Sequence, residues 1–314
     1  MKSKLGSNDI RWTAAGAAVL LAGMLVVLHF YKEQNPSAQL AFKARRVDLV
    51  ERMQRDLAAA SEAEKSAVLA ITDQDSQTLA DQAHAASANV EVERRELEEL
   101  LTAGGTPDER ELLAQFATAS VELQTIDNDL LALAVKNTNL KAYGLAFGPA
   151  AAAVSEMNAA LARLVAAQAD APAAKPVMHL AYDAQLGALR LQTLLPPHIA
   201  EENDRKMDAL EVQMATEDAL VRHSLAGLTT IPALSHDPEL AIATARYAEF
   251  CTLKTNILAL SRENTNVRSL SLSLNQKRKV MLVCQGLLGA LQQAILAEPI
   301  AGVTYGTPVR PRQL

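Results

Sequence analysis

The chain has 314 residues, of which 49% are hydrophobic and only 4% aromatic, and its formal net charge is -6 at pH 7. Because phosphate binding needs clustered Lys and Arg, this acidic balance argues against nucleic acid as a partner. Gly and Pro number only 13 and 12, and so few turn-forming residues favour long helices over short strands. The composition therefore predicts an all-α protein with enough length for about two domains.

The N-terminal segment predicts a transmembrane helix. Residues 12–30 read WTAAGAAVLLAGMLVVLHF without a formal charge, and about 20 apolar residues cross a bilayer as a helix. We place the anchor at residues 12–31. Lys2, Lys4 and Arg11 then put residues 1–11 in the cytoplasm by the positive-inside rule. The alternative is a cleaved signal peptide with a weak cleavage site at residues 36–38.

The next hundred residues show apolar seams of helical spacing that are separated by breaks. A long helix leaves the membrane and extends to Ile71, and residues 72–76 read as a break. A second helix ends at residues 103–107, where Pro107 suits the first position of a third. That third helix has the 3-4-3 seam of a bundle helix, formed by Leu123, Ile126, Leu130 and Leu133.

A short motif occurs twice. The stretch LALAVKNTNL at residues 131–140 recurs as LALSRENTNV at residues 258–267, and in both an Asn stands where the next seam residue is due. Asn suits a left-handed helix end or an N-cap. We therefore predict that one helix ends and another begins at each motif. The residues with turn or cap roles are Asn137, Asn139, Asn264 and Asn266. An alternative break lies at Gly148-Pro149, matched by Asn275-Gln276 in the second copy.

The repeat predicts a duplicated domain. We expect two tandem antiparallel four-helix bundles at residues 36–169 and 177–297, joined by a linker at residues 170–176 and followed by a tail at residues 298–314. In the second copy, Pro196-Pro197 and residues 231–238 read as breaks. Residues 280–297, VMLVCQGLLGALQQAILA, are uncharged, but three glutamines and a clean seam favour a bundle helix over a second membrane span.

These elements resemble a known family. A membrane helix with a long helix after it, TPDERELLAQF at residues 106–116 and LALAVKNTN at residues 131–139 resemble the four-helix-bundle sensor module of bacterial methyl-accepting chemotaxis receptors. LALSRENTNVRSLSLSL at residues 258–274 resembles the same module, so the likeness covers nearly everything from Ala38 to Ala297 as two copies. The resemblance implies a single-pass sensor of the inner membrane with its bulk in the periplasm. Such a sensor binds a small ligand or a partner protein, often as a homodimer.

The chain departs from that family after the second predicted bundle. Only residues 298–314 follow, and they contain no linker module and no long coiled-coil signalling hairpin. We therefore expect any signal to leave through a separate signalling protein. The alternative function is that of a structural or adaptor protein, whose helical bundles dimerise or dock to a membrane partner without a ligand.

The sequence does not indicate catalysis or metal binding. It has no Gly-rich phosphate loop, no G-x-S-x-G and no H-E-x-x-H, and its six histidines show no ligand spacing. We therefore predict no enzyme activity, no metal and no cofactor. Cys251 and Cys284 form either a disulfide or two buried thiols, and we favour the thiols because the two side chains point in different directions on their predicted helices.

Four arginines on the first long helix are the candidate ligand-binding residues: Arg45, Arg46, Arg52 and Arg55. Arginine forks bind carboxylates, so this cluster predicts a grip on a ligand carboxylate at a dimer interface. The alternative is a solvated face on which the arginines pair with Asp48, Glu51 and Asp56 at helical spacing.

Overall fold

The structure is a computed structural model that describes residues 36–300, and this part of the chain is helical throughout, without a strand. The predicted anchor lies outside the described residues. The α-helices are α2 (Pro36–Leu69), α3 (Asp73–Gly104), α4 (Pro107–Ala134), α5 (Thr138–Leu145), α6 (Ala151–Ala167), α7 (Ala174–Ala200), α8 (Asp204–Thr229), α9 (Pro238–Glu263), α10 (Thr265–Leu272) and α11 (Arg278–Ala297). Two π-helices, η1 (Ala146–Ala150) and η3 (Ser273–Lys277), and the 3-10 turn η2 (Pro232–Leu234) complete the fold.

Several helices begin where the sequence supplies a cap. At the start of α4, the backbone N–H of Glu109 donates to the Thr106 hydroxyl over 3.2 Å, and the Thr106 N–H donates back to the Glu109 carboxylate over 3.1 Å. This reciprocal pair is a capping box, and Pro107 occupies the first helical position. Residues 106–109 therefore start a helix for local reasons, as predicted. The predicted break at Pro196-Pro197 is wrong, because α7 continues through both prolines and ends at Ala200.

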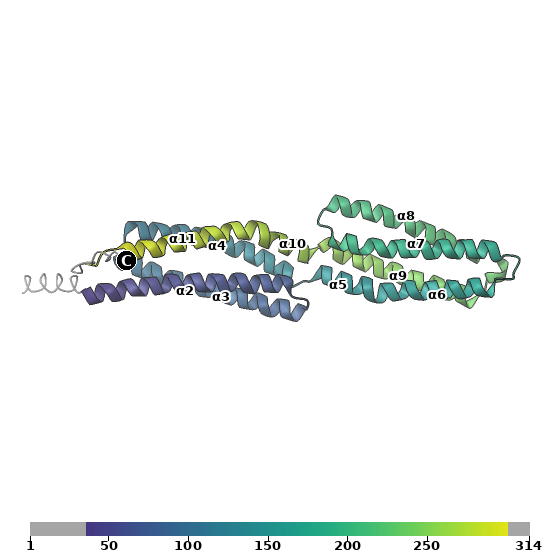
Figure 1. Ribbon diagram of the computed structural model, residues 1–314, viewed down its shortest axis with the longest axis horizontal. Helices are drawn as coiled ribbons and strands as arrows, with labels where there is room; N and C mark the ends of the chain where they lie inside the picture. Colours follow the sequence, from purple (N-terminus) through teal and green to yellow (C-terminus); the bar gives the residue numbers. More distant parts are fainter. Residues whose placement is uncertain (1–35, 301–314) are drawn as a thin grey trace, which may run out of the picture. The chain divides into compact units, whose positions relative to one another are not determined.

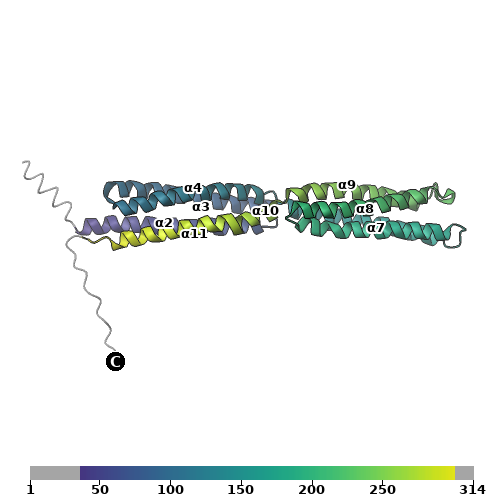
Figure 2. The ribbon, with the colours of Figure 1, turned by 90° about the horizontal axis from the view of Figure 1, so that it is seen from above.

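The described residues form two compact units, each made of several chain segments. Unit 1 contains residues 36–58, 86–120 and 282–300, and unit 2 contains residues 59–85 and 121–281. Within unit 1, α11 lies beside α2: the Lys43 ammonium donates to the carbonyl oxygen of Leu296 over 2.7 Å, and the Gln292 amide donates to Glu51 over 3.1 Å (Figure 2). The helix expected to close the second module thus packs with α2, the first helix of the described residues.

Within unit 2, helices α6, α7, α8 and α9 pack as a bundle (Figure 1). α7 packs on α8, and α6 packs on α9 and α7. The core of this bundle is aliphatic, and its completely buried members include Leu161, Leu164, Leu191, Leu195 and Ile257. The helix expected to close the first module, α5–α6, therefore packs with α7 and α9 from the second copy. The predicted bundles, at residues 36–169 and 177–297, therefore differ from the groups of helices that pack together in the structure. A seam of 3-4-3 spacing shows that a helix has a buried face but does not select its partner.

Both Asn-Thr-Asn motifs break their helices, as predicted. Asn137 and Asn264 have φ angles of 51° and 52°, and they are the only residues other than glycine with positive φ among residues 36–300. The alternative break positions, around Gly148 and Asn275, lie in η1 and η3, where the helix widens into a π-turn without ending. Each copy therefore carries a left-handed Asn followed by a π-turn.

The two motifs bond to each other within unit 2, and we call residues 137–139 with residues 264–266 the paired turn. The Thr138 N–H donates to the Thr265 hydroxyl over 3.2 Å, and the Thr265 N–H donates to the Thr138 hydroxyl over 3.1 Å. The Asn139 N–H likewise donates to Asn266 Oδ1 over 3.2 Å, and the Asn266 N–H donates to Asn139 Oδ1 over 3.1 Å. The first N–H groups of a helix have no partner inside that helix. Here each copy caps the helix of the other copy, whereas the sequence predicted a cap within the same copy.

The left-handed asparagines add further bonds to the paired turn. Asn139 Nδ2 donates to Asn264 Oδ1 over 2.7 Å, and Asn266 Nδ2 donates to Asn137 Oδ1 over 2.9 Å. The end of α7 is held here as well, because Asn139 Nδ2 also donates to the Ile199 carbonyl and Asn264 Nδ2 donates to the Glu201 carbonyl. Asn137 and Asn264 are both 1% exposed. Their side chains are therefore part of a buried hydrogen-bond network.

Two helical runs, Pro107–Ala167 and Pro238–Ala297, are long and apolar enough to cross a membrane by length and composition, which allows membrane association. Core helices of a bundle share this length and composition. In the second run, Cys284, Leu288, Leu291 and Ile295 are completely buried inside unit 1. One face of α11 is thus used for packing within the protein, as a bundle helix requires.

We expect Asn264→Ala to lower the free energy of unfolding by about 3 kcal/mol, because it combines a left-handed non-glycine residue, about 1–2 kcal/mol, with unsatisfied buried partners, about 1–3 kcal/mol. Asn264→Gly removes only the hydrogen bonds and should cost about half as much. Urea unfolding of the full chain measures both. If the two variants are equally stable, the tolerance of Asn264 for a left-handed backbone does not contribute to the free energy of unfolding.

Candidate functional site

A buried group of three charged side chains lies in unit 2. The Lys277 ammonium, from η3, lies 2.7 Å from Glu64 Oε2 on α2 and 2.8 Å from Asp127 Oδ1 on α4. The side chains of Lys277, Glu64 and Asp127 are 3%, 1% and 10% exposed. One lysine therefore connects three helices through charge, in a position where water contributes little.

The charges in this group do not balance. Two carboxylates face one ammonium, and Glu64 Oε1 has no hydrogen-bond partner within residues 36–300. Burial raises the pKa of the Asp127 carboxyl, and the neighbouring Lys277 opposes that shift only in part. A buried ion group of this kind is weak evidence for stability, because desolvation of the ions offsets their attraction.

A pocket of about 260 Å³ adjoins Lys277. Its polar lining comes from α2, through Ser61 and Lys65, and from η3 and the start of α11, through Ser273, Lys277 and Arg278. Lys65 and Arg278 form no ion pair with a carboxylate of the described residues. Lys277, in contrast, is neutralised by Glu64 and Asp127. Two free cations and two hydroxyls around one pocket can bind a small anion, because Arg offers a planar fork and Lys a point charge to an oxyanion.

The first copy of the motif provides an internal comparison. It has the same π-turn, η1, but Ala146 and Ala150 stand where the second copy has Ser273 and Lys277. The two alanines are 3% and 0% exposed and belong to the apolar core. The backbone turn therefore forms without a buried charge. π-turns inside α-helices are frequent at functional sites, and here the second copy carries polar residues in a turn that also forms without them.

The predicted arginine cluster lies in unit 1, and most of it already holds carboxylates. Arg45 bonds Glu96 and Asp48, and Arg52 bonds Asp48. Arg46 is buried, bonds Glu109 over 2.7 Å and Glu298, and lies 4.7 Å from the centre of the Phe42 ring. Arg55 is exposed, without an ion pair inside residues 36–300. The structure thus does not bring the four arginines together as free cations, and ligand binding by them stays a prediction.

The Arg46 pair explains part of the predicted motif TPDE at residues 106–109. Glu109 is completely buried, and its Oε2 accepts both from the Thr106 N–H and from Arg46 over 2.7 Å. The carboxylate therefore caps α4 and neutralises an arginine of α2 at the same time. This is a structural role within unit 1.

Cys251 and Cys284 are not joined by a disulfide. Cys251, on α9 in unit 2, lies 3.5 Å from an Asp218 oxygen, and burial raises the pKa of its thiol. Cys284, on α11, is completely buried in unit 1. The disulfide alternative required a chain that folds back at Asn264, but Cys251 belongs to unit 2 and Cys284 to unit 1.

Sequence reasoning missed the group around Lys277, although one signal was present. The seam of the second copy runs through Leu270, Leu274, Lys277 and Met281, so a lysine occupies an apolar position. Its partners Glu64 and Asp127 are 213 and 150 positions away (277 − 64 and 277 − 127), and no local pattern predicts such pairing. Within residues 36–300, no group of three or more His, Cys, Asp or Glu is placed to hold a metal ion.

No family model matches the chain, and no curated protein matches it either. The resemblance to the chemoreceptor sensor module therefore rests on the helical patterns alone. What the chain does has to be argued from the chemistry of its own residues.

We expect Lys277→Ala to lower the free energy of unfolding by about 3 kcal/mol at pH 7, because two buried carboxylates lose their counter-ion. The loss should shrink toward about pH 4. Burial raises the pKa of the Asp127 carboxyl, so without Lys277 the folded state binds this proton more tightly than the unfolded chain and gains stability as the pH falls. Urea unfolding at several pH values measures this.

The control is a triple variant, Lys277→Ala with Glu64→Leu and Asp127→Leu, which copies the apolar solution of η1. It should recover most of the lost stability and show no such pH dependence. A triple variant as unstable as Lys277→Ala would show that the ion group is needed for folding.

Proposed function

We propose that the protein is a membrane-anchored extracytoplasmic sensor that binds a small anionic ligand in the pocket beside Lys277. The observation that carries the proposal is the pair of free cations, Lys65 on α2 and Arg278 at the start of α11, in the lining of a pocket that also offers two hydroxyls. A ligand carboxylate, or an oxyanion of similar size, satisfies all of these groups at once.

The geometry suggests how binding could change the protein. The pocket is lined by α2 on one side and by η3 and the first residues of α11 on the other. An anion between Lys65 and Arg278 would hold these two elements together, next to the point where Lys277 connects η3 to α2 and α4. A ligand shifts an equilibrium only through different affinity for two states. Here that difference lies in the distance between the two cations.

The proposal includes a location and partners. We propose a single-pass protein of the inner membrane with its bulk in the periplasm, acting as a homodimer and signalling through a separate protein. Its support is the uncharged stretch at residues 12–30, with Lys2, Lys4 and Arg11 before it. The second candidate function is the structural or adaptor protein. It is favoured by large apolar residues left exposed on α11, namely Leu282, Val283 and Leu296.

The location has its own test. Alkaline phosphatase fused after Leu314 should be active in a bacterial host, because the enzyme needs the oxidising periplasm to form its disulfides. A cytoplasmic reporter such as β-galactosidase at the same position should be inactive. The opposite pattern would place the helical region in the cytoplasm.

Ligand binding is tested on the full chain in lipid nanodiscs, with acetate, succinate and inorganic phosphate as probes. We expect at least one probe to raise the melting temperature in a saturable way. Arg278→Ala should abolish the rise. The matched control is Lys279→Ala, because Lys279 is the next residue, is also an exposed cation and does not line the pocket.

Two results would count against the proposal. The first is the absence of a saturable response to all three probes, and a stable oligomer under the same conditions would then support the adaptor function. The second is an equal loss of response in Arg278→Ala and Lys279→Ala, which would mean that binding depends on the general surface charge.

A further inference from the structure

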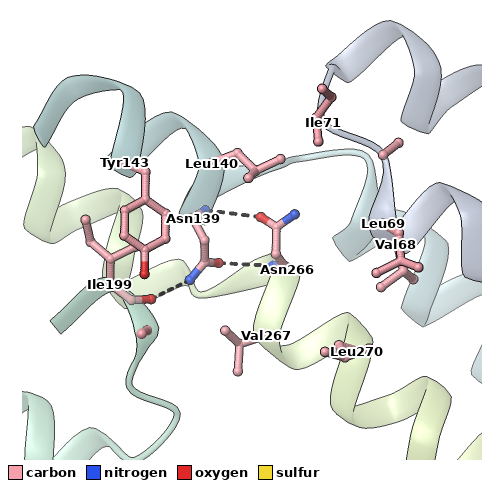
Figure 3. A pocket seen from close by; sticks show the side chains of 12 residues that line it. Val68, Leu69, Ile71, Asn139, Leu140, Tyr143, Ile199, Asn266, Val267 and Leu270 are labelled. Atoms are coloured by element: carbon pink, nitrogen blue, oxygen red, sulfur yellow. Dashed lines mark hydrogen bonds between the residues drawn. The ribbon is translucent and has the colours of Figure 1, made fainter. Parts of the chain in front are cut away.

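A second cavity, of about 340 Å³, lies on the paired turn in unit 2 (Figure 3). Both copies of the repeat contribute the same positions to its lining. These positions form three matched pairs: Asn139 with Asn266, Leu140 with Val267, and Tyr143 with Leu270. The rest of the lining of this open cavity comes from residues 68–71, at and after the end of α2, and from Ile199 and Ala200 at the end of α7. It is separate from the anion pocket, since the two share no lining residue.

The lining indicates an uncharged ligand. Apart from two asparagines and Tyr143, the residues around the cavity are aliphatic, and none is Asp, Glu, Lys, Arg or His. A charged molecule would lose its hydration here without finding a counter-charge. At the rim, Leu69 and Ile71 are 71% and 80% exposed. These side chains stay in water unless a bound molecule covers them.

One polar group in the cavity has hydrogen-bonding capacity to spare. The Asn266 amide donates one N–H to Asn137 Oδ1, and its oxygen accepts from the Asn139 N–H. Figure 3 shows the Asn266 amide nitrogen turned away from Asn139. An amide has two N–H groups, and the second has no acceptor within residues 36–300. Asn139, in contrast, uses both of its N–H groups, for Ile199 and Asn264. A ligand with one acceptor atom satisfies Asn266.

We propose that this cavity binds a small neutral molecule with an apolar body, about the size of a substituted aromatic ring, and one hydrogen-bond acceptor for the Asn266 amide. The volume lies at the lower end of ligand pockets and is too small for a helix of a partner protein. Because matched residues of both copies line it, one ligand contacts both halves of the paired turn at once and stabilises their pairing. The proposal does not depend on the anion pocket.

The probe is 4-fluoroacetophenone, which is neutral and carries one carbonyl acceptor, followed by its fluorine NMR signal. We expect saturable line broadening with the full chain in nanodiscs, above that of empty nanodiscs. 4-Fluorobenzoate, of similar shape but charged, should not bind here. 4-Fluorotoluene, which lacks the acceptor, should bind several-fold more weakly.

Leu270→Trp fills the cavity from a position that is 40% exposed and should weaken binding of 4-fluoroacetophenone at least tenfold. The matched control is Ile242→Trp, at a position on α9 that is 41% exposed and outside the cavity, and it should leave binding unchanged. Ala200→Trp, at the exposed end of α7, fills the cavity from the other side and decides the test if Leu270→Trp unfolds the protein. Circular dichroism checks folding in each case.

Three results would overturn the proposal. They are the absence of saturable binding to the native chain, undiminished binding in folded Leu270→Trp or Ala200→Trp, and binding of 4-fluorobenzoate that these two variants abolish. Benzoate binding that persists in both variants would instead come from elsewhere on the protein and would leave the neutral site supported if 4-fluoroacetophenone is lost.

Discussion

The paired turn is the interaction on which the arrangement of unit 2 depends. A helix that restarts after a left-handed residue begins with N–H groups that have no partner inside the helix. Buried N–H groups of this kind are costly unless they are bonded. Here the two restarts solve the problem together, because Thr138 and Thr265 exchange bonds, and Asn139 and Asn266 do the same. Neither turn is satisfied without the other.

This exchange has a consequence for the fold. Once residues 138 and 265 are joined, each helix that follows a motif starts beside the other copy, so α5–α6 joins α7 and α9 and α10–η3 joins residues of α2 and α4. Two separate antiparallel bundles would instead need the chain to reverse its direction at the Asn of each copy. The left-handed Asn interrupts the helix. The hydrogen bonds between the two motifs then determine which helices the following helix packs against.

Much of the local structure could be predicted from the sequence. Which helices pack together, and which distant charged residues pair, could not. The capping box at residues 106–109 and the left-handed asparagines are local features, so their residue types predict their geometry. The choice between α3 and α7 as the neighbour of α6 is not local, because apolar seams of the same spacing are interchangeable. The candidate site follows the same division: Lys277 stands out as a lysine in a seam, but Glu64 and Asp127 are found only in three dimensions.

The charged side chains of the two units differ in whether they have partners. In unit 1 the arginines near the start of α2 are matched by carboxylates on α3 and α4 and by Glu298, the residue after α11. In unit 2 the charges beside η3 are not matched, and cations remain free on the rim of a pocket. The duplicated backbone makes this contrast informative, since η1 carries alanines at the same positions. In our proposal, the exposed Lys65 and Arg278 are available for an anionic ligand.

The two cavities of unit 2 are joined by one short run of helix. Residues 265–272 form α10, which begins at the paired turn and passes directly into η3, where Ser273 and Lys277 face the anion pocket. The start of α11 follows without a break. A helical segment of this length moves as a unit, and its N-terminal end is held by bonds from Thr138 and Asn139. A displacement of η3 against α2 therefore has to be accommodated at the paired turn, where the hydrogen bonds are buried or partly buried. If the anion pocket binds a ligand as proposed, the paired turn is the point at which a change at that pocket reaches the first copy of the repeat.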